Sequence, residues 1–541
     1  MFKKLFAFDI FQIVSFMFLM LMAMLLIQFI PALFSPVSSA WLTVQNYLLT
    51  PMLINTLVLA LGSGLFAGVM GVSFAYIVTF FRFPFRKTFA WLLVLPLAMP
   101  SYVVAYVYTA MTSYQGTLDQ FFRLFLTMNQ PLSISNMMGA ILLFGVTLYP
   151  YVYLSARSFL LRQPASLMDS ARLLGKSELA IFWNIFLPLL KPALIGAMVL
   201  VMMEVINDYG LTSYFGLNVF ATGIFQLWFN GNDIQSAIRL SMVILLVIFT
   251  VLWIESILRK QKPYGYATTR LKPMKPIPLS GWMNTLTLSS MSAVLALGFF
   301  IPLLQFLLWL PWVNEVAWDA FFSLALWNTV ALSTVVALLI AFIAFSLNQA
   351  LRKPNSLLRQ ALKRFATLGY SVPGSIIALA VVMLLAPLDR WIFVQFNLNF
   401  LVLSSLFVLL IIALVIRYFA VSFNFTESGF QKIGMKFTQA SYTLGQSKLA
   451  TAFLIDLPMV QQSLLAGTLI VMVDLFKELP LTLFLRPLGF DTLATRIFQF
   501  AGDEQVLQST PLALLLIGVT SLFVVFANRL MIKGKIDESI H

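Results

Sequence analysis

The sequence predicts an all-α protein that crosses a lipid bilayer about twelve times, and its composition and apolar runs both point to this fold class. Hydrophobic residues make up 60% of the 541 residues and charged residues only 10%, against roughly 25% charged residues in soluble domains. Apolar runs of about 20 residues, each long enough to cross a bilayer, recur along the chain. The mean hydropathy of +0.93 disfavours a large soluble protein with a buried core.

The apolar runs give twelve predicted spans. The first follows the short basic start of the chain, and it is too long for the apolar core of a cleavable signal peptide, so we interpret it as an uncleaved helix. In chain order the predicted spans are 5–31, 51–81, 89–111, 136–160, 189–208, 236–258, 282–311, 324–350, 364–386, 400–423, 460–480 and 509–532.

The basic residues predict the orientation of these spans. With the N-terminus in the cytoplasm, most of the 34 Lys and Arg residues fall on the cytoplasmic side, Arg417 among them. Positive charge stays on that side of a membrane. We therefore expect a multi-pass membrane protein with both termini in the cytoplasm. The net charge of +14 then reflects topology and contact with lipid, and nucleic-acid binding need not be invoked.

The residue types exclude most catalytic sites. The chain has no cysteine, and its single histidine is the last residue, His541. Disulfides, thiolate sites, histidine metal clusters and an ordinary Ser/His/Asp arrangement are therefore excluded. No G-x-x-x-x-G-K-[ST] run occurs, so any ATP must be hydrolysed by another chain. We predict no catalytic residue, metal site or cofactor in this chain.

Two similar halves make up the chain. Asn55-Thr56 corresponds to Asn328-Thr329, and Pro100 in LPLAMP corresponds to Pro373 in GYSVPG, both at the same offset in sequence. Each half holds six spans, so the halves enter the membrane in the same orientation and should be related by a pseudo-twofold axis along the membrane normal. A shared path would lie between them. The predicted parts are a first repeat at 1–258, a basic, proline-containing cytoplasmic linker at 259–281 and a second repeat at 282–541.

Glycine and proline mark two further features of the spans. LPLAMP and its counterpart GYSVPG resemble broken helices near a possible path. The second span carries Gly62, Gly64, Gly68 and Gly71, a spacing of small residues that favours close helix packing.

A polar segment interrupts the apolar pattern once in each half, at 169–192 and 439–462. Each predicts an amphipathic helix, a turn at Gly175 or Gly445 and a second short helix that ends near a Leu-Pro pair. All matched positions in the two segments share one offset, slightly shorter than that of the Asn-Thr pairs. In a membrane protein, such a repeated polar helix-turn-helix suggests a docking surface for a soluble partner. Alternatively, the two segments are amphipathic helices that only cover the edge of the bilayer.

Four carboxylates follow these segments as two pairs with the same offset as the segments themselves: Glu204 with Asp474, and Asp208 with Glu478. An acidic side chain deep in a span costs about 2.5–3.5 kcal/mol, and such residues usually face a cavity or a partner. One interpretation is an acidic path for a cationic substrate, moderated by Lys477. The other is local pairing and capping at the helix ends. Gly210 and Pro480 should break both helices there.

The paired segments resemble the EAA loops of ABC importer permeases, which seat on the ATPase subunits. The family pattern, Glu-Ala-Ala, three residues, Gly and a run ending in Leu-Pro, is matched approximately, with Gln439 in place of the acidic residue of the second loop. The resemblance implies the type I ABC importer permease fold and a place in a bacterial inner membrane. It also implies docking of two copies of an ATPase subunit on Asp169, Ala171, Gly175, Leu187 and Pro188, and on Gln439, Ala440, Gly445, Leu457 and Pro458.

Two fused six-helix halves with a Lys-Glu-Leu-Pro run at 477–480 are similar to the ferric-iron-type permeases. This resemblance implies import of ferric iron delivered by a periplasmic or surface substrate-binding protein, without enzymatic activity in this chain. Thiamine, polyamine and phosphonate permeases resemble the same run, and those substrates stay open. A different class, the ion-coupled secondary transporter, also has internal repeats and buried acids, but it needs no ATPase docking loops.

Overall fold

The protein is a bundle of long helices. Its structure is a computed structural model that describes residues 9–34, 36–126, 133–161, 163, 165–259, 276–279, 281–314, 318, 320–352, 357–398, 402–405 and 407–537. Within these residues, eleven helices are long and apolar enough to cross a membrane, and a bent pair makes a twelfth candidate. The prediction of about twelve spans is confirmed. Most of the predicted linker, residues 260–275, lies outside the described part of the chain.

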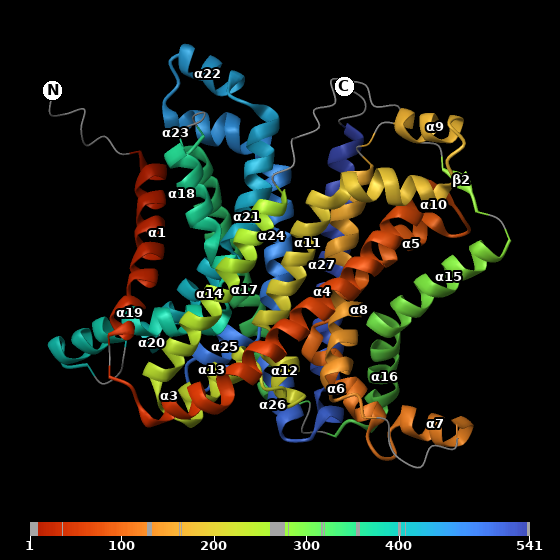
Figure 1. Cartoon of the computed structure of the whole chain (residues 1–541). Coiled ribbons are helices and arrows are strands. Elements are labelled where there is room, and N and C mark those ends of the chain that lie inside the picture. Colours follow the sequence, from red (N-terminus) through yellow and green to blue (C-terminus); the bar gives the residue numbers. More distant parts are fainter. Residues whose placement is uncertain are drawn as a thin grey trace.

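The first half runs from α1 to α14 (Figure 1). Its helices are α1 (Ile10–Ile27), α2 (Ile30–Leu33), α3 (Ser39–Thr43), α4 (Leu49–Phe80), α5 (Arg86–Leu92), α6 (Ser101–Thr112), α7 (Thr117–Leu126), α8 (Met137–Leu160), α9 (Ala165–Leu173), α10 (Glu178–Ile181), α11 (Leu187–Asn207), α12 (Gly210–Tyr214), α13 (Phe220–Phe225) and α14 (Ile234–Arg259).

The second half runs from α15 to α27. Its helices are α15 (Trp282–Leu295), α16 (Ile301–Trp309), α17 (Ala320–Ala350), α18 (Leu357–Thr367), α19 (Gly374–Gln395), α20 (Val402–Ser405), α21 (Val408–Ile433), α22 (Lys436–Thr443), α23 (Lys448–Thr451), α24 (Leu457–Phe476), α25 (Pro480–Leu485), α26 (Leu493–Gly502) and α27 (Thr510–Asp537). The strands β1 (Phe81–Arg82) and β2 (Ile277–Pro278) form one short parallel pair.

The internal repeat is visible in matched hydrogen bonds. Asn55 on α4 donates its amide to the carbonyl of Asn218 at 3.0 Å, and Asn328 on α17 donates to the carbonyl of Asp491 at 2.9 Å. The two donors and the two acceptors are related by the same offset in sequence. The neighbouring Thr56 and Thr329 accept the backbone N–H of the corresponding next segments. The repeated Asn-Thr pair thus ties the same two segments together in each half.

The first span of each half packs against the helices of the other half, an arrangement that the sequence did not predict. The α1 helix packs on α17 and α21, with the Phe11 and Phe345 rings 5.9 Å apart and the Phe18 and Phe419 rings 4.4 Å apart. The start of the second half, in turn, contacts α6, where the hydroxyl of Tyr108 donates to the carbonyl of Leu297 at 2.7 Å. This exchange interlocks the halves.

The small-residue stripe on α4 packs closely against neighbouring helices, as predicted. A Cβ added at Gly71 would lie 2.6 Å from the Cβ of Val152 and 2.9 Å from the carbonyl oxygen of Tyr149 on α8. One at Gly64 would lie 2.9 Å from the side chain of Met202 on α11. Small residues therefore allow α4 to approach both helices.

Both predicted broken spans are present. A 3₁₀ turn at Leu95–Ala98 ends the first piece, Pro100 precedes α6, and the two pieces are bent by 87°. In the second half a 3₁₀ turn at Leu368–Ser371 and Pro373 precede α19. Proline lacks the N–H that a continuous helix would need, so a new helix begins after it.

Two predicted spans are displaced along the chain. The span expected at 364–386 begins at Gly374, because 357–367 forms the separate amphipathic helix α18. The span expected at 400–423 is α21, Val408–Ile433. Arg417 lies inside this span in both the prediction and the structure, and its side chain is 5% exposed, so its assignment to the cytoplasmic side was wrong.

Candidate functional site

The two helices that carry the predicted acidic residues both break at matched places in the two repeats. The α11 helix ends at Asn207 and α12 begins at Gly210; α24 ends at Phe476 and α25 begins at Pro480. At Gly210 the reason is close approach, since an added Cβ would lie 2.7 Å from the Cβ of Tyr102. The predicted breaks at Gly210 and Pro480 are confirmed.

Asp208 and Glu478 have the same local role in the two halves. Asp208 accepts the backbone N–H of Leu211 at 2.8 Å, at the start of α12. Glu478 accepts the N–H groups of Leu481 and Thr482 at 2.7 and 3.0 Å, at the start of α25, and the Thr482 hydroxyl at 2.7 Å. Each carboxylate thus satisfies N–H groups that the new helix leaves free. The capping interpretation holds for this pair.

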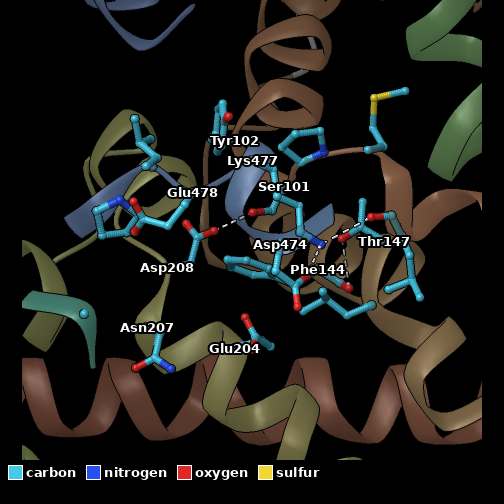
Figure 2. A pocket seen from close by; sticks show the side chains of 18 of the residues that line it. Ser101, Tyr102, Phe144, Thr147, Glu204, Asn207, Asp208, Asp474, Lys477 and Glu478 are labelled. Carbon is cyan, nitrogen blue, oxygen red and sulfur yellow. Dashed lines mark hydrogen bonds and ion pairs between the residues drawn. The ribbon is translucent and has the colours of Figure 1, made fainter. Parts of the chain in front are cut away.

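A cavity of about 110 Å³ lies between the halves at these breaks (Figure 2). Five predicted residues line it: Glu204, Asp208, Asp474, Lys477 and Glu478. Glu204 and Asp208 come from the first half and the other three from the second. The repeat offset that linked them in sequence therefore corresponds to one shared site in space.

Both broken spans also reach this cavity. Pro100, Ser101 and Gly374 line it, and the hydroxyl of Ser101 donates to the carboxylate of Asp208. Figure 2 shows this bond between the start of α6 and the break after α11. The bent pair of the first half is thus tied to the helix that carries the first pair of acids.

Two further contacts cross from one half to the other. The hydroxyl of Tyr370 donates to Glu204 at 2.7 Å. Lys477 pairs with Asp474 at 3.1 Å, and its ammonium lies 3.4 Å from the carbonyl of Leu97. The 3₁₀ turns of both broken spans therefore meet the helices that carry the acids.

Arg417 is a cavity residue that the sequence analysis missed. Its guanidinium donates to the carbonyls of Tyr370 and Val372 at 2.8 and 2.7 Å and so holds the second 3₁₀ turn. The argument applied to the acids would have found it, because a charged side chain within an apolar run is equally costly and equally in need of a partner.

The cavity is lined by more negative than positive side chains, and some of its polar groups have no hydrogen-bond partner. Four carboxylates face two cations, Lys477 and Arg417, which leaves a formal charge of −2 when all are ionised. Among the described residues, both amide atoms of Asn207 and the hydroxyl of Tyr102 are buried without a hydrogen-bond partner. The charge of the site therefore favours cations, and these buried polar groups have unused capacity to form hydrogen bonds.

The two polar segments, which we name loop one (169–192) and loop two (439–462), lie at the same end of the bundle (Figure 1). Gly175 and Gly445 have φ of +74° and +83°, and nothing lies within 4 Å of an added Cβ. In both, the glycine N–H and the next N–H bond back into the preceding helix, which is a Schellman ending. The predicted turns therefore require glycine for its backbone conformation, not for space.

The predicted end of the second short helix at Leu187-Pro188 and Leu457-Pro458 was wrong. In each loop a π-turn, Phe182–Phe186 or Ala452–Asp456, joins the short helix to α11 or α24 without interruption. Because of this wider turn, Pro188 and Pro458 stand at the start of α11 and α24, where the N–H that proline lacks is not needed.

The other predicted loop residues differ in exposure. On the first helix of each loop, Asp169, Gln439 and Ala440 are exposed and Ala171 is buried. At the start of α11 and α24, Pro188 and Pro458 are exposed, whereas Leu187 and Leu457 are half-buried. Apolar side chains that the sequence analysis did not single out are exposed in matched pairs: Leu174 and Leu444, Leu179 and Leu449, Trp183 and Phe453. Their periodicity alone could not separate them from a buried helix face.

Comparison with known proteins matches both halves. The sequence model of the family described as "Binding-protein-dependent transport system inner membrane component" matches residues 64–262 and 340–532. The chain is 25% identical over 471 residues to the Fe(3+)-transport system permease protein FbpB 2 of Haemophilus influenzae, covering 86% of this chain and 87% of that protein.

Shorter matches cover about a third of this chain. The sulfate transport system permease protein CysT of Salmonella typhimurium is 27% identical over 165 residues, 30% of this chain and 58% of that protein. The sn-glycerol-3-phosphate transport system permease protein UgpE of Yersinia pestis is 29% identical over 182 residues, 33% of this chain and 58% of that protein.

Proposed function

This chain belongs to the family of binding-protein-dependent transport system inner membrane components, and from that premise we propose that it carries ferric iron through the membrane in an ATP-driven importer. The chain is an ABC importer permease. In the proposal, a periplasmic binding protein delivers the substrate, and two copies of an ATPase subunit bind at loop one and loop two.

The matched apolar surfaces of the loops carry the ATPase part of the proposal. Leu174 and Leu444 are 79% and 83% exposed on two loops at one end of the bundle. Bulky apolar side chains gathered on a charged, polar loop are typical of a protein interface. Two such surfaces of the same design suit two copies of one partner, which favours an ATP-driven importer over an ion-coupled transporter.

The charge of the cavity supports a cationic substrate. A formal −2 in a site of low dielectric attracts cations and repels anions. Ferric iron, polyamines and thiamine fit that sign, whereas a phosphonate does not. The iron assignment rests on the full-length similarity to a protein named for Fe(3+) transport; a polyamine is the second candidate.

A binding experiment tests the loop surfaces. Leu174→Glu and Leu444→Glu place a charge on each surface, and the double variant should abolish co-purification of the ATPase subunit, with each single variant weakening it. Leu358→Glu is the matched control, since Leu358 is 68% exposed on α18, outside both loops. Undiminished co-purification with the double variant would contradict docking at the loops.

A further inference from the structure

The two loops are fastened to the helix bundle by different chemistry at matched positions. In loop two the fastening residue is Asp456, the last residue of the π-turn and 1% exposed. The matched position in loop one is Phe186, also 1% exposed and also last in its π-turn. A buried carboxylate and a buried ring thus occupy one place in the two repeats.

Asp456 receives three donors from two other elements. The Arg352 guanidinium pairs with it at 2.7 Å, the Gln349 amide donates at 2.7 Å, and the Thr438 hydroxyl donates at 2.6 Å. Gln349 lies at the end of α17 and Arg352 two residues beyond it, and Thr438 lies in α22, the first helix of loop two. The carboxylate therefore joins both helices of the loop to the long span α17.

Arg352 extends this cluster to α21. It donates to the carbonyl of Gly434, which lies between α21 and α22, and its guanidinium lies 4.6 Å from the ring centre of Phe430. Charge-assisted hydrogen bonds have a fixed direction and strengthen in a buried site. Loop two is consequently held in one orientation relative to α17, α21 and α24.

The first half has rings where the second has this polar cluster. Tyr76 stands at the position of Gln349, and Thr79 stands at that of Arg352. The rings of Tyr76 and Phe80 lie 5.9 and 4.5 Å from Phe186. The Tyr76 hydroxyl also donates to the carbonyl of Glu178 in loop one, at the longer distance of 3.3 Å. Ring packing with this long, uncharged hydrogen bond is less directional than an ion pair, so it resists sliding less than the short hydrogen bonds of Asp456 do.

Asp456 lies at the base of the helix that reaches the cavity. Asp474 follows it by eighteen residues on one continuous helix, which corresponds to about 27 Å at 1.5 Å per residue. A displacement of loop two can thus pass along α24 to the cavity acids, provided that the loop is fixed to the base of this helix.

We propose that Asp456 is a positioning residue that couples loop two to the membrane helices, and that the two loops are therefore mechanically unequal. Loop two moves as one body with α17 and α24, whereas loop one moves against its ring cluster. This inference rests on the proposed function, in that it takes both loops to be ATPase docking sites.

Asp456→Asn tests the coupling role, since it keeps the shape and removes the charge. The ATPase should still co-purify, because the exposed surface of loop two is unchanged. The amount of substrate taken up per ATP hydrolysed should fall about tenfold, because the buried cluster loses a charge-assisted hydrogen bond. The control Glu427→Gln breaks the more exposed Lys363–Glu427 pair of 2.6 Å at the same end of the second half, and should leave that ratio within about twofold.

Spin-label distances give a readout that loss of stability alone would not move. The chain has no cysteine, so introduced pairs are unique. One pair, at Gln360 and Gln446, reports loop two; the corresponding pair, at Lys87 and Lys176, reports loop one, and all four positions are exposed. Asp456→Asn should broaden the 360–446 distance distribution and leave the 87–176 distribution narrow.

The outcomes are separable. An unchanged ratio of uptake to ATP, with a narrow 360–446 distribution, overturns the inference. Failure of the unmodified chain to bind the ATPase overturns the proposed function instead. If Asp456→Asn does not fold, Thr438→Val removes one donor with little change of shape; it should lower the same ratio less steeply, and a wild-type ratio there would equally overturn the inference.

Discussion

Glu204 and Tyr370 are 166 residues apart in sequence, yet the Tyr370 hydroxyl donates to the Glu204 carboxylate at 2.7 Å and joins the two halves across the cavity. The matched place in the first half is Leu97, whose carbonyl lies 3.4 Å from the Lys477 ammonium. The halves therefore meet through two contacts made at matched places of the broken spans, although the partners Glu204 and Lys477 are not at matched positions. Only one of them uses a side chain of the broken span.

Removing that hydroxyl should loosen the contact between the halves. Tyr370→Phe leaves the Glu204 carboxylate without this donor, a loss of order 1–3 kcal/mol for a buried group. We expect ATP hydrolysis without binding protein to rise several-fold, because the arrangement in which Tyr370 and Glu204 join the halves is less favoured. Tyr153→Phe is the control, since it removes a 3.0 Å bond to the carbonyl of Ala90 within the first half and outside the cavity. Equal basal hydrolysis in both variants and in the wild type would contradict a role of this contact in holding the halves together.

The charge of the cavity is tested best at Asp208. Asparagine also caps helices well, so Asp208→Asn should keep the bond from Leu211 while losing the charge. We expect normal amounts of protein and about tenfold slower uptake, measured with the binding protein in excess. The control is Asp233→Asn, because Asp233 caps α14 away from the cavity. Wild-type uptake by Asp208→Asn would mean that Asp208 only caps α12 and that its charge is not needed for transport.

Glu478→Gln should be more severe than Asp208→Asn. The Glu478 carboxylate accepts three hydrogen bonds, and a glutamine side chain offers one oxygen and turns its NH₂ toward a donor. Both uptake and the amount of folded protein should therefore fall, as measured by quantitative immunoblot of equal membranes. If Glu478→Gln is better expressed than Asp208→Asn, the capping geometry is not what holds α25.

The turn of loop two gives a prediction about backbone conformation. Since Gly445 has φ of +83° and open space around its Cα, Gly445→Asn should be tolerated far better than Gly445→Val, because only asparagine visits that region readily. The expected order of uptake is glycine, asparagine, valine, with the valine variant at least about tenfold lower. Equal loss in both variants would point to steric exclusion by the partner instead.

Orientation in the membrane can be tested with single cysteines. We predict that Gln446→Cys in loop two is shielded from an impermeant thiol reagent in intact cells, whereas Leu124→Cys on α7, at the opposite end of the bundle and 76% exposed, is labelled. Inverted membrane vesicles should give the reverse pattern. Labelling of position 446 from outside would overturn the predicted cytoplasmic side.

The sequence predicted those features that recur in both halves. Spans, loops and acids repeat along the chain, and the pairs Glu204–Asp474 and Asp208–Glu478 line one cavity because the repeat places them alike. Arg417 and Tyr370 have no counterpart of their type, since Thr147 and Leu97 occupy the matched places. A search for repeated chemistry could not single them out.

Other errors have local or long-range causes. A Leu-Pro pair normally ends a helix, but a π-turn before Pro188 and Pro458 accommodates the missing N–H, and nothing in the pattern of apolar residues marks that turn. The exchange of first spans between the halves depends on contacts such as Phe18 with Phe419. Such contacts join residues far apart in the chain, and no single sequence reveals them.

ATP-driven uptake by the reconstituted transporter tests the central claim most directly. Proteoliposomes would hold this chain with its ATPase subunit, with iron-loaded binding protein outside and ATP inside, without an ion gradient. We predict iron accumulation that requires ATP, ATPase subunit and binding protein together, and that Leu174→Glu with Leu444→Glu abolishes it. Accumulation by this chain alone, driven by a proton or sodium gradient and unaffected by those two substitutions, would contradict the account.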